Sequence, residues 1–558
     1  MVLNMTDRAI RHSLAAGFAL ALIPVLAAAQ TPPDAGALQQ QIERERQQQL
    51  PRRIAPEKPA APAAMQPASG VVVTVRQFRF AGNTLMSAEQ LAPMVRDYLD
   101  RPLDFTQLQA AAAAVAEAYR AAGWVVNAYL PQQDIKDGIV IIQIIEAVFG
   151  KLKIEGALPQ RVSAGRLERI FAGQQASGVR LNADALDRAL LLADDLPGVT
   201  AAGSLVAGSR EGETDLVLKM ADEPLVAGDA ALDNTGARST GADRLTANVN
   251  FNSPFGFGDL LSSNLIHNKG SDYLRLGYTV PVGSNGWRVG ANASHLNYKV
   301  VNNDFSTLGA KGASDSTGLE ASYPIRRSRL SNLYLNLNYD RKRFDNQMAG
   351  GATTTRYGID DFGLGLNGNL FDNWGGGGAN SANLTLVSGK RDNDVGTTQQ
   401  NFSKLRYGLS RQQVITNELS VFAQLAGQEA NVALDSSEKF YLGGAGGVRA
   451  YPANEGGGDS AVLTNIELRW KLAAGFTLIS FYDYGHVRNE GGAMSYSLKG
   501  SGLSLGWETP LGVNLKATWA RRLGANPNAI AVAGAGYGHD QDGSLDKNRL
   551  WLSASLPF

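Results

Sequence analysis

Cysteine is absent from the 558-residue chain, which excludes disulfides and metal sites built on cysteine. That absence is compatible with passage through an oxidising compartment. An excess of charge of one sign is missing too. The 52 lysines and arginines balance the 52 aspartates and glutamates, so the composition holds no general attraction for nucleic acid. The five histidines show no metal-ligand spacing. We therefore expect neither a metal nor a cofactor.

Long hydrophobic runs are scarce, and the one substantial run extends from Leu14 to Ala29. Two arginines and a histidine precede it, and Ala27 and Ala29 occupy the small positions that signal peptidase prefers. This pattern predicts a signal peptide over residues 1–29. A membrane anchor is the weaker interpretation, because the run is shorter than the ~20 residues that a spanning helix needs and contains a glycine and a proline. The mature protein is then periplasmic, secreted or a membrane barrel.

A polar helix and a linker follow the predicted signal peptide. Asp34 can cap a helix within residues 30–50, in which Leu38 and Ile42 are nearly the only apolar side chains. Such a helix has no core to join, so we expect it either to be unstable or to be surrounded by water. Residues 51–70 contain five prolines among alanines, which favours an extended, semi-rigid spacer.

Residues 71–222 form two similar α/β units, which we divide into residues 71–147 and 148–222. Each unit has the predicted order strand, helix, helix, strand, strand. In the first unit, the last two strands are expected over residues 125–130 and 139–145, with Asp137 and Gly138 as the hairpin turn. The recurrence of the same order over about 75 residues is an internal repeat, although the residue identities differ.

Helical periods disappear in residues 223–558, where short segments of alternating polarity follow one another. The last of them runs from Leu550 to Phe558, with apolar residues at the even positions. We count sixteen candidate strands, an even number, with roughly 20 residues for each strand and its connection. These features predict a transmembrane antiparallel β-barrel, which would also leave no exposed strand edges. A large soluble β protein is the alternative.

Two motifs within this region carry a resemblance to a known family. The first is Val448-Arg449-Ala450-Tyr451, and the second is Phe481-x-Asp483-x-Gly485. They resemble the Val-Arg-Gly-Tyr/Phe and Phe-x-Asp-x-Gly motifs of two-partner secretion outer-membrane transporters, the haemolysin and filamentous-haemagglutinin exporters. These transporters belong to a superfamily in which polypeptide-transport-associated (POTRA) domains precede a barrel.

The resemblance covers nearly the whole mature chain and implies two POTRA domains, a plug helix and a sixteen-stranded barrel. It also implies that Arg449, on the sixth extracellular loop, pairs with Asp483 inside the barrel. Glu467 is a plausible further acceptor for the guanidinium. Ala450 departs from the motif's usual glycine, so we expect a slightly different backbone at the loop tip. The alternative, a solvated Arg449 and an unrelated lumen charge at Asp483, stays open.

Three other patterns suggest chemistry that their surroundings argue against. Gly502–Gly506 has the spacing of a nucleophile elbow and Gly363–Gly368 that of a dinucleotide-binding loop, but both lie in alternating strands. Residues 540–546 contain three aspartates, Asp540, Asp542 and Asp546, which could bind calcium weakly. A solvated acidic loop is the simpler expectation. The sequence offers no credible pair of nucleophile and base, so we do not expect an enzyme.

The function that the resemblance implies is export of an unfolded protein across the bacterial outer membrane without ATP. The POTRA domains would capture the partner exoprotein, a haemolysin, adhesin or contact-dependent toxin, in the periplasm. We expect Leu556 and Phe558 to form a signal for the barrel-assembly machinery. Further expected partners are outer-membrane lipid or lipopolysaccharide and periplasmic chaperones. We expect the protein itself to be monomeric. A barrel-assembly insertase and a passive porin are the alternatives.

Overall fold

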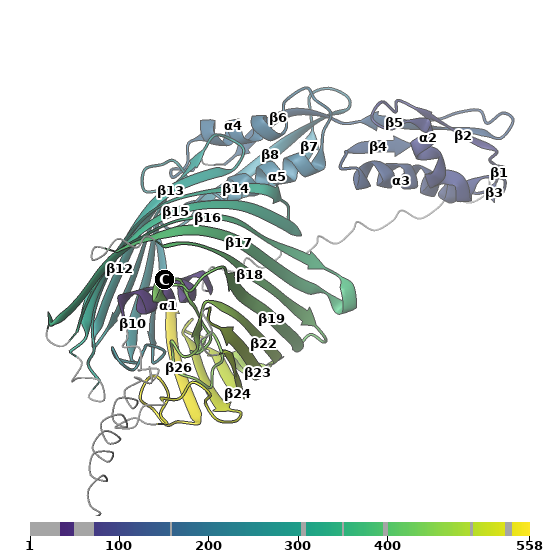
Figure 1. The fold of residues 1–558 in the computed structure, drawn as a ribbon. Coiled ribbons are helices and arrows are strands. Elements are labelled where there is room, and N and C mark those ends of the chain that lie inside the picture. Colours follow the sequence, from purple (N-terminus) through teal and green to yellow (C-terminus); the bar gives the residue numbers. More distant parts are fainter. Residues whose placement is uncertain are drawn as a thin grey trace, which may run out of the picture.

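The computed structural model describes residues 34–48, 72–156, 159–302, 309–348, 351–393, 400–490, 495–530 and 538–558. The predicted signal peptide, the linker 51–70 and the ends of the predicted helix 30–50 lie outside these ranges. Figure 1 shows an arm of two α/β units beside a large barrel, with helix α1 (Ala35–Gln48) among the barrel strands. Within the described ranges, no helix combines the length and hydropathy needed to cross a bilayer.

The first α/β unit contains a three-stranded sheet covered by helices. The sheet has the order β2-β5-β4, with β2 parallel to β5 and β4 antiparallel to it. Ser87 and Asp104 cap the two helices that follow β2, each with a side-chain acceptor and a reciprocating glutamine. Its elements are β1 (Val73–Thr74), β2 (Gln77–Ala81), α2 (Ala88–Leu91), the 3-10 helix η1 (Ala92–Tyr98), β3 (Pro102–Leu103), α3 (Phe105–Ala121), β4 (Val126–Tyr129) and β5 (Ile139–Glu146).

The predicted hairpin in this unit is present, because β4 pairs antiparallel with β5. Asp137 and Gly138 do form a turn with positive φ at both positions, closed by the Ile139 amide on the Lys136 carbonyl at 3.0 Å. However, β4 ends at Tyr129, so residues 130–138 separate the strands. The Gln133 side chain pairs with both backbone groups of Ile141, at 2.7 and 2.8 Å, and so takes the place of strand backbone. The predicted turn thus leads directly into β5, at the end of the connection between the two strands.

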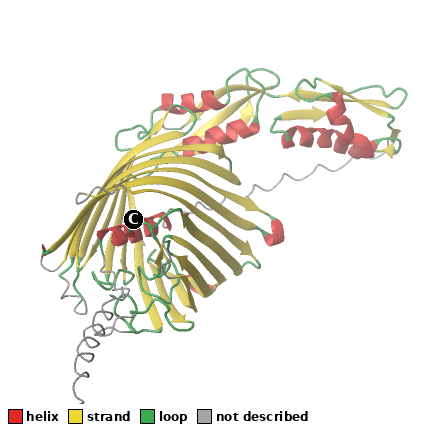
Figure 2. Cartoon of the chain, in the orientation of Figure 1, coloured by secondary structure: helices red, strands yellow, loops and turns green. Residues whose placement is uncertain are grey.

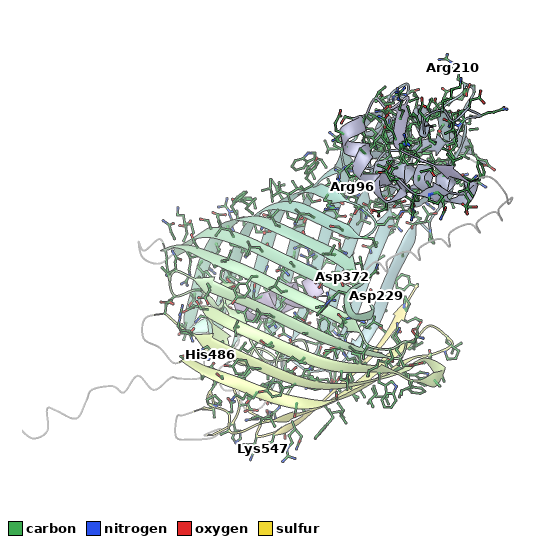
Figure 3. All side chains as sticks on the ribbon, turned by 90° about the vertical axis from the view of Figure 1, so that its right-hand side faces the viewer. Arg96, Arg210, Asp229, Asp372, His486 and Lys547 are labelled. Carbon is green, nitrogen blue, oxygen red and sulfur yellow. The ribbon has the colours of Figure 1, made fainter. Side chains whose placement is uncertain are left out.

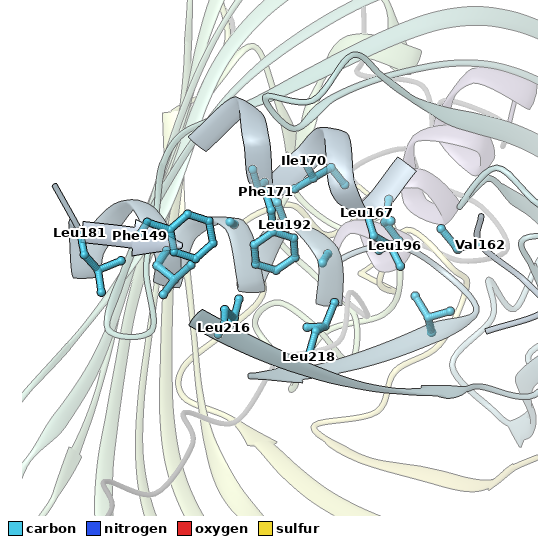
Figure 4. Close-up of a cluster of buried hydrophobic side chains, with 14 of the residues drawn as sticks. Phe149, Val162, Leu167, Ile170, Phe171, Leu181, Leu192, Leu196, Leu216 and Leu218 are labelled. Atoms are coloured by element: carbon cyan, nitrogen blue, oxygen red, sulfur yellow. The ribbon is translucent and has the colours of Figure 1, made fainter. Parts of the chain in front are cut away.

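The second unit repeats this architecture. It consists of β6 (Val148–Glu155), α4 (Ala164–Gln174), α5 (Ala183–Asp194), β7 (Val199–Ala207) and β8 (Glu213–Asp222). The sheet order is β6-β8-β7, again with one parallel and one antiparallel pair. Apolar side chains of both helices pack on the sheet, with Phe149 and Phe171 in the core shown in Figure 4. The predicted strand–helix–helix–strand–strand repeat is thus present.

Sixteen strands close into one antiparallel barrel, as the sequence predicted. β26 pairs with β9, and the amides of Gly228 and Phe558 exchange hydrogen bonds of 2.8 and 2.9 Å with each other's carbonyls. The strands are β9 (Val226–Asp233), β10 (Arg244–Asn252), β11 (Leu260–Asn268), β12 (Ser271–Val282), β13 (Trp287–Lys299), β14 (Lys311–Arg327), β15 (Ser331–Met348), β16 (Thr353–Asp372), β17 (Gly378–Asn393), β18 (Gln400–Val414), β19 (Leu419–Ala430), β22 (Ser460–Lys471), β23 (Phe476–Arg488), β24 (Ser495–Glu508), β25 (Asn514–Arg522) and β26 (Asn548–Pro557).

The two faces of the barrel wall have the predicted opposite polarity. On β26 the even-numbered Leu550, Leu552 and Leu556 are exposed on the outside, whereas Trp551 is buried on the inside. An apolar outer face fits lipid, and a polar inner face fits a wet lumen. The two glycine patterns lie within β24 and β16, so neither has the strand-to-helix turn that its chemistry requires. Figure 2 places the described helices almost entirely in the arm, apart from α1 and short turns.

Candidate gate in the barrel lumen

The long connection between β19 and β22, residues 431–459, folds back into the barrel, and we name it loop 6. It contains a short 3-10 helix, η5 (Ser436–Glu438), and two short paired strands, β20 (Phe440–Tyr441) and β21 (Gly457–Gly458). At its tip, the Val448 amide donates to the Leu442 carbonyl at 2.7 Å. A Cβ at Gly447 would lie 1.9 Å from that carbonyl oxygen, so only glycine permits this close turn.

Arg449 projects from the loop 6 tip onto the barrel wall and binds Asp483 and Glu467. Its Nη2 lies 2.6 Å from Asp483 Oδ1, its Nε lies 2.9 Å from Oδ2, and its backbone amide also donates to Oδ2 at 3.0 Å. Nη1 donates to Glu467 Oε1 at 2.8 Å. The guanidinium carbon lies 3.5 Å from the ring centroid of Phe481. The structure thus brings together the two motifs and the further acceptor.

The remaining motif residues make room for this arrangement. A Cβ at Gly485 would come within 2.7 Å of the Leu442 side chain, so the glycine leaves space for loop 6. Ala450 is fully buried, and Gly500 faces its methyl group, because a Cβ at Gly500 would lie 2.6 Å from it. Ala450 is not among the described residues with positive φ, so its methyl group adds no left-handed strain. Val448 and Tyr451 are buried beside it.

Two residues that the motif analysis missed complete the site. Asn465 donates to Asp483 Oδ1 at 2.8 Å and to the Gly447 carbonyl at 3.1 Å. Trp551 donates from Nε1 to the Arg449 carbonyl at 2.8 Å. Strand alternation placed Trp551 on the inner face, and a buried indole N–H needs an acceptor. That alternation was the available signal, but it did not identify the acceptor.

The interpretation of residues 540–546 as a solvated acidic loop is wrong for Asp540 and Asp542, which are buried. Asp540 Oδ2 lies 2.7 Å from Arg522 and 3.0 Å from Arg549, and Asp542 lies 3.3 Å from Arg549. Arginines of the adjoining strands thus balance the two carboxylates. Asp546 is exposed and contributes its backbone carbonyl to Arg522. Across the described ranges, no group of three or more His, Asp or Glu side chains is arranged to hold a metal.

The expectation that α1 has no core to join is also wrong. Ala35, Leu38 and Ile42 lie along one side of the helix and are buried. They belong to an apolar cluster with inward-facing side chains of the wall, including Tyr273 and Phe344. Three apolar residues are enough to give the helix an apolar contact, because this patch of the lumen wall is itself aromatic and aliphatic. Asp34 caps the helix as predicted, accepting from the Ala37 amide at 2.8 Å.

Charged and polar contacts tie α1 to the barrel wall. Glu45 pairs with the buried Arg244 at 2.7 Å, and Glu43 accepts from Tyr273 at 2.7 Å and pairs with Arg275 at 3.3 Å. These polar contacts add to the apolar stripe in holding α1 against the wall.

Two further contacts tie α1 to loop 6. Ser436 donates to Asp34 at 2.8 Å, and Arg44 donates to the Tyr441 carbonyl with its guanidinium 4.8 Å from the Phe440 ring centroid. A cavity of about 540 Å³ lies between α1, loop 6 and the wall. Helix and loop therefore occupy the lumen together.

A closed sixteen-stranded barrel, two POTRA-like units and a loop locked inside the lumen define an outer-membrane transporter. A family profile described as haemolysin secretion/activation protein ShlB/FhaC/HecB matches residues 212–509. A profile described as POTRA domain, ShlB-type, matches residues 73–147. Because the first match spans more than half of the chain, this protein belongs to the ShlB/FhaC/HecB family of two-partner secretion transporters. Its barrel lies in the outer membrane and its POTRA domains lie in the periplasm.

Two transporter proteins are similar in sequence to the chain over most of their length. The chain is 26% identical over 567 residues to the heme/hemopexin transporter protein HuxB of Haemophilus influenzae strain 86-028NP, covering 94% of this chain and 95% of that protein. It is 23% identical over 473 residues to the outer membrane transporter CdiB of Dickeya dadantii, covering 81% of each.

Solved structures support the same fold. CdiB from Escherichia coli superposes with a TM-score of 0.70 at 20% identity, over 94% of this chain and 98% of that one. BamA from Haemophilus ducreyi lacking POTRA domains 1–3 gives a TM-score of 0.53 at 15% identity, over 88% of this chain and 100% of that one. The fold of the chain is thus more similar to that of CdiB than to that of BamA.

Proposed function

We propose that the barrel is a closed exit for an unfolded exoprotein, and that loop 6 and α1 form the gate. The observation that carries this proposal is Arg449, bound inside the lumen by Asp483 and Glu467. A guanidinium withdrawn from bulk water needs such acceptors, and a bidentate carboxylate gives it one geometry. Loop 6 therefore has a defined resting position, which an exported chain must displace together with α1.

The POTRA domains supply the capture step in this proposal. β4 and β7 are edge strands of their sheets in the described structure, so their outer backbone groups can pair with an extended client. Such pairing makes little demand on sequence, which suits an unfolded client. The periplasm lacks ATP, and export would be driven by folding of the client outside the cell. We propose no enzymatic activity and no cofactor.

Several expected partners belong to the same proposal. The client is a large secreted exoprotein, namely a haemolysin, an adhesin, a contact-dependent toxin or, by analogy with the name of HuxB, a protein of heme or hemopexin acquisition. Leu556 and Phe558, both exposed on the outer face, would present the assembly signal. The other expected partners are outer-membrane lipid, the barrel-assembly machinery and periplasmic chaperones. The transporter itself would be a monomer. The divisions 71–147, 148–222 and 223–558 are our proposed domain boundaries.

The test is Arg449→Ala in the full-length transporter. Removing one partner of a buried ion pair costs ~3–5 kcal/mol, and less where water reaches the site. We expect the barrel to assemble, as judged by heat-modifiable migration on gels, while secretion of the exoprotein falls at least about tenfold. Arg469→Ala is the matched control, because Arg469 binds the same Glu467, together with Gln412, but comes from the barrel wall and not from loop 6. Normal secretion by Arg449→Ala would remove this lock from the mechanism.

A further inference from the structure

A second buried carboxylate of loop 6 lies apart from the Arg449 pair. Glu455 is fully buried, and in the described part of the chain no lysine or arginine forms an ion pair with it. Its Oε1 accepts from Asn528 Nδ2 at 2.7 Å and from Asn526 Nδ2 at 3.3 Å, and its Oε2 accepts from the Gln541 amide at 3.0 Å. A buried charge is tolerated only when it is well hydrogen-bonded. All three donors belong to one other loop.

That other loop connects β25 to β26, and we name it loop 8. Its described residues are 523–530 and 538–547. Arg522, at the end of β25, adds a second contact, because its guanidinium carbon lies 4.9 Å from the ring centroid of Tyr451 on loop 6. Arg522 also pairs with Asp540 of loop 8 at 2.7 Å. One cation thus touches the loop 6 tip and the loop that holds Glu455.

Loop 8 is itself held to the barrel rim. Asp540 and Asp542 pair with Arg549 at the start of β26, and Arg238, from the β9–β10 connection, donates to the Asp542 carbonyl at 3.1 Å. Asn526 donates to Asp540 at 2.8 Å, which joins the two described parts of the loop. Figure 3 places Lys547, the last residue of loop 8, at the end of the molecule far from Arg210 of the arm. The contacts to Glu455 therefore lie toward the cell exterior.

We propose that loop 8 is a second lock on loop 6, in which Glu455, Asn528 and Arg522 are positioning residues. This inference rests on the proposed function, because it specifies how the gate is held. Arg449 fastens the tip of loop 6 to the wall, whereas Glu455 fastens the returning arm of the same loop to the exterior rim. The two attachments share no hydrogen-bonding side chain. Loop 6 leaves the lumen only when both have opened.

The experiment uses the full-length protein in intact cells. The chain contains no cysteine, so Ala445→Cys, at the half-buried loop 6 tip, is the single site for a membrane-impermeant maleimide. We expect Glu455→Ala and Asn528→Ala each to raise the labelling rate at least about fivefold. Lys547→Ala, an exposed position of loop 8, leaves that rate unchanged. Asn528→Ala removes one neutral donor and keeps the measurement interpretable if Glu455→Ala fails to assemble.

A reversible cross-link supplies the converse test. In a Glu455→Cys/Asn528→Cys variant, a short bis-methanethiosulfonate reagent would join loop 6 to loop 8. We expect it to abolish the large openings of the purified transporter in planar bilayers in KCl, and a reductant to restore them. Labelling rates that match Lys547→Ala, or openings that persist in the cross-linked protein, would overturn the second lock. Neither readout depends on secretion, so a failure of the Arg449→Ala test is distinguishable.

Discussion

A single carboxylate, Glu146, joins three parts of the periplasmic arm. It is the last residue of β5 and is buried. Its Oε1 accepts from the amides of Thr84 and Leu85, both at 2.7 Å, and from the Tyr119 hydroxyl at 3.1 Å. Arg180 of the second unit lies 3.3 Å from Oε2 and donates to the Glu146 carbonyl at 3.0 Å. One residue therefore orders a loop, a helix and the next domain.

The pH dependence of this joint follows from its hydrogen bonds. Burial by itself would raise the pKa of Glu146, but the bonds from Thr84 and Leu85 outweigh burial and lower the pKa below its usual value. A depressed pKa means that the stabilisation is complete above the unfolded pKa of ~4.3 and is lost as the pH falls through the folded value. The first POTRA domain should accordingly loosen under acid conditions.

We predict that Glu146→Gln weakens hydrogen-exchange protection of residues 139–146 at pH 7 by about 1–3 kcal/mol, because buried donors lose a charged acceptor. The difference from the wild type should shrink below about pH 4 as Glu146 protonates. Comparing both proteins at each pH cancels the intrinsic exchange rate. Glu117→Gln is the control, because Glu117 pairs with Arg120 on an exposed helix face. A difference that stays constant down to pH 3 would contradict the assignment.

At the scale of elements, α1 is held in the lumen by a narrow apolar stripe together with ion pairs at its C-terminal half. Gly36 lets the helix approach loop 6, because a Cβ there would come within 2.8 Å of Ser436 Oγ. The helix is short and mostly polar, so its folding depends on this docking and not on its own propensity. An element held by a few side chains is suited to leaving its site.

We predict that deleting residues 34–50 raises the resting ion conductance in planar bilayers. The double change Leu38→Gln and Ile42→Gln should raise it as well, because the apolar stripe loses its contacts while helix propensity is retained. Arg46→Gln serves as the control, since Arg46 is partly exposed and pairs with Glu43 of the same helix. If the deletion leaves the conductance unchanged, α1 is not a plug.

At the scale of the whole molecule, the second POTRA domain is fixed to the periplasmic turns of the barrel. Asp195, just after α5, binds Arg327 through two hydrogen bonds of 2.7 and 3.0 Å. Asp187 of α5 pairs with the half-exposed Arg329 at 2.7 Å. The two POTRA domains are also joined, because the Ala183 amide donates to the Gly123 carbonyl at 2.7 Å. A captured client is thereby delivered at a defined position beside the barrel mouth.

We predict that Asp195→Ala broadens the distribution of distances between two spin labels. The labels are attached at Glu168→Cys on α4 and at Leu511→Cys on an exposed barrel turn. The buried Arg327 loses charged hydrogen bonds worth about 1.5–3 kcal/mol each before solvent screening. Asp187→Ala should change the distribution little, because exposed ion pairs contribute ~0–1 kcal/mol. Pulsed electron paramagnetic resonance measures both variants. Equal broadening by the two would mean that neither pair determines the domain orientation.

The fold was accessible from the sequence to the extent that its signals are local. Alternating polarity along each strand reports which face meets lipid, and sixteen such segments identified the barrel before its closure through Phe558 was seen. Through family resemblance, the two motifs predicted that Arg449 pairs with Asp483, and the two side chains lie 2.6 Å apart. The Asp137–Gly138 turn was accessible in the same way, because its two residues carry a local turn signal, and the structure confirms it.

What the sequence by itself determined is the strand pattern and the repeated α/β unit, and family resemblance added the expected pairing of Arg449 with Asp483. Only the tertiary structure decided what α1 packs against, that Asp540 and Asp542 are neutralised by arginines, and that Glu455 meets loop 8. The donors to Glu455 lie 71, 73 and 86 positions away from it. Their meeting depends on barrel closure and strand register, which no periodicity within a single segment encodes.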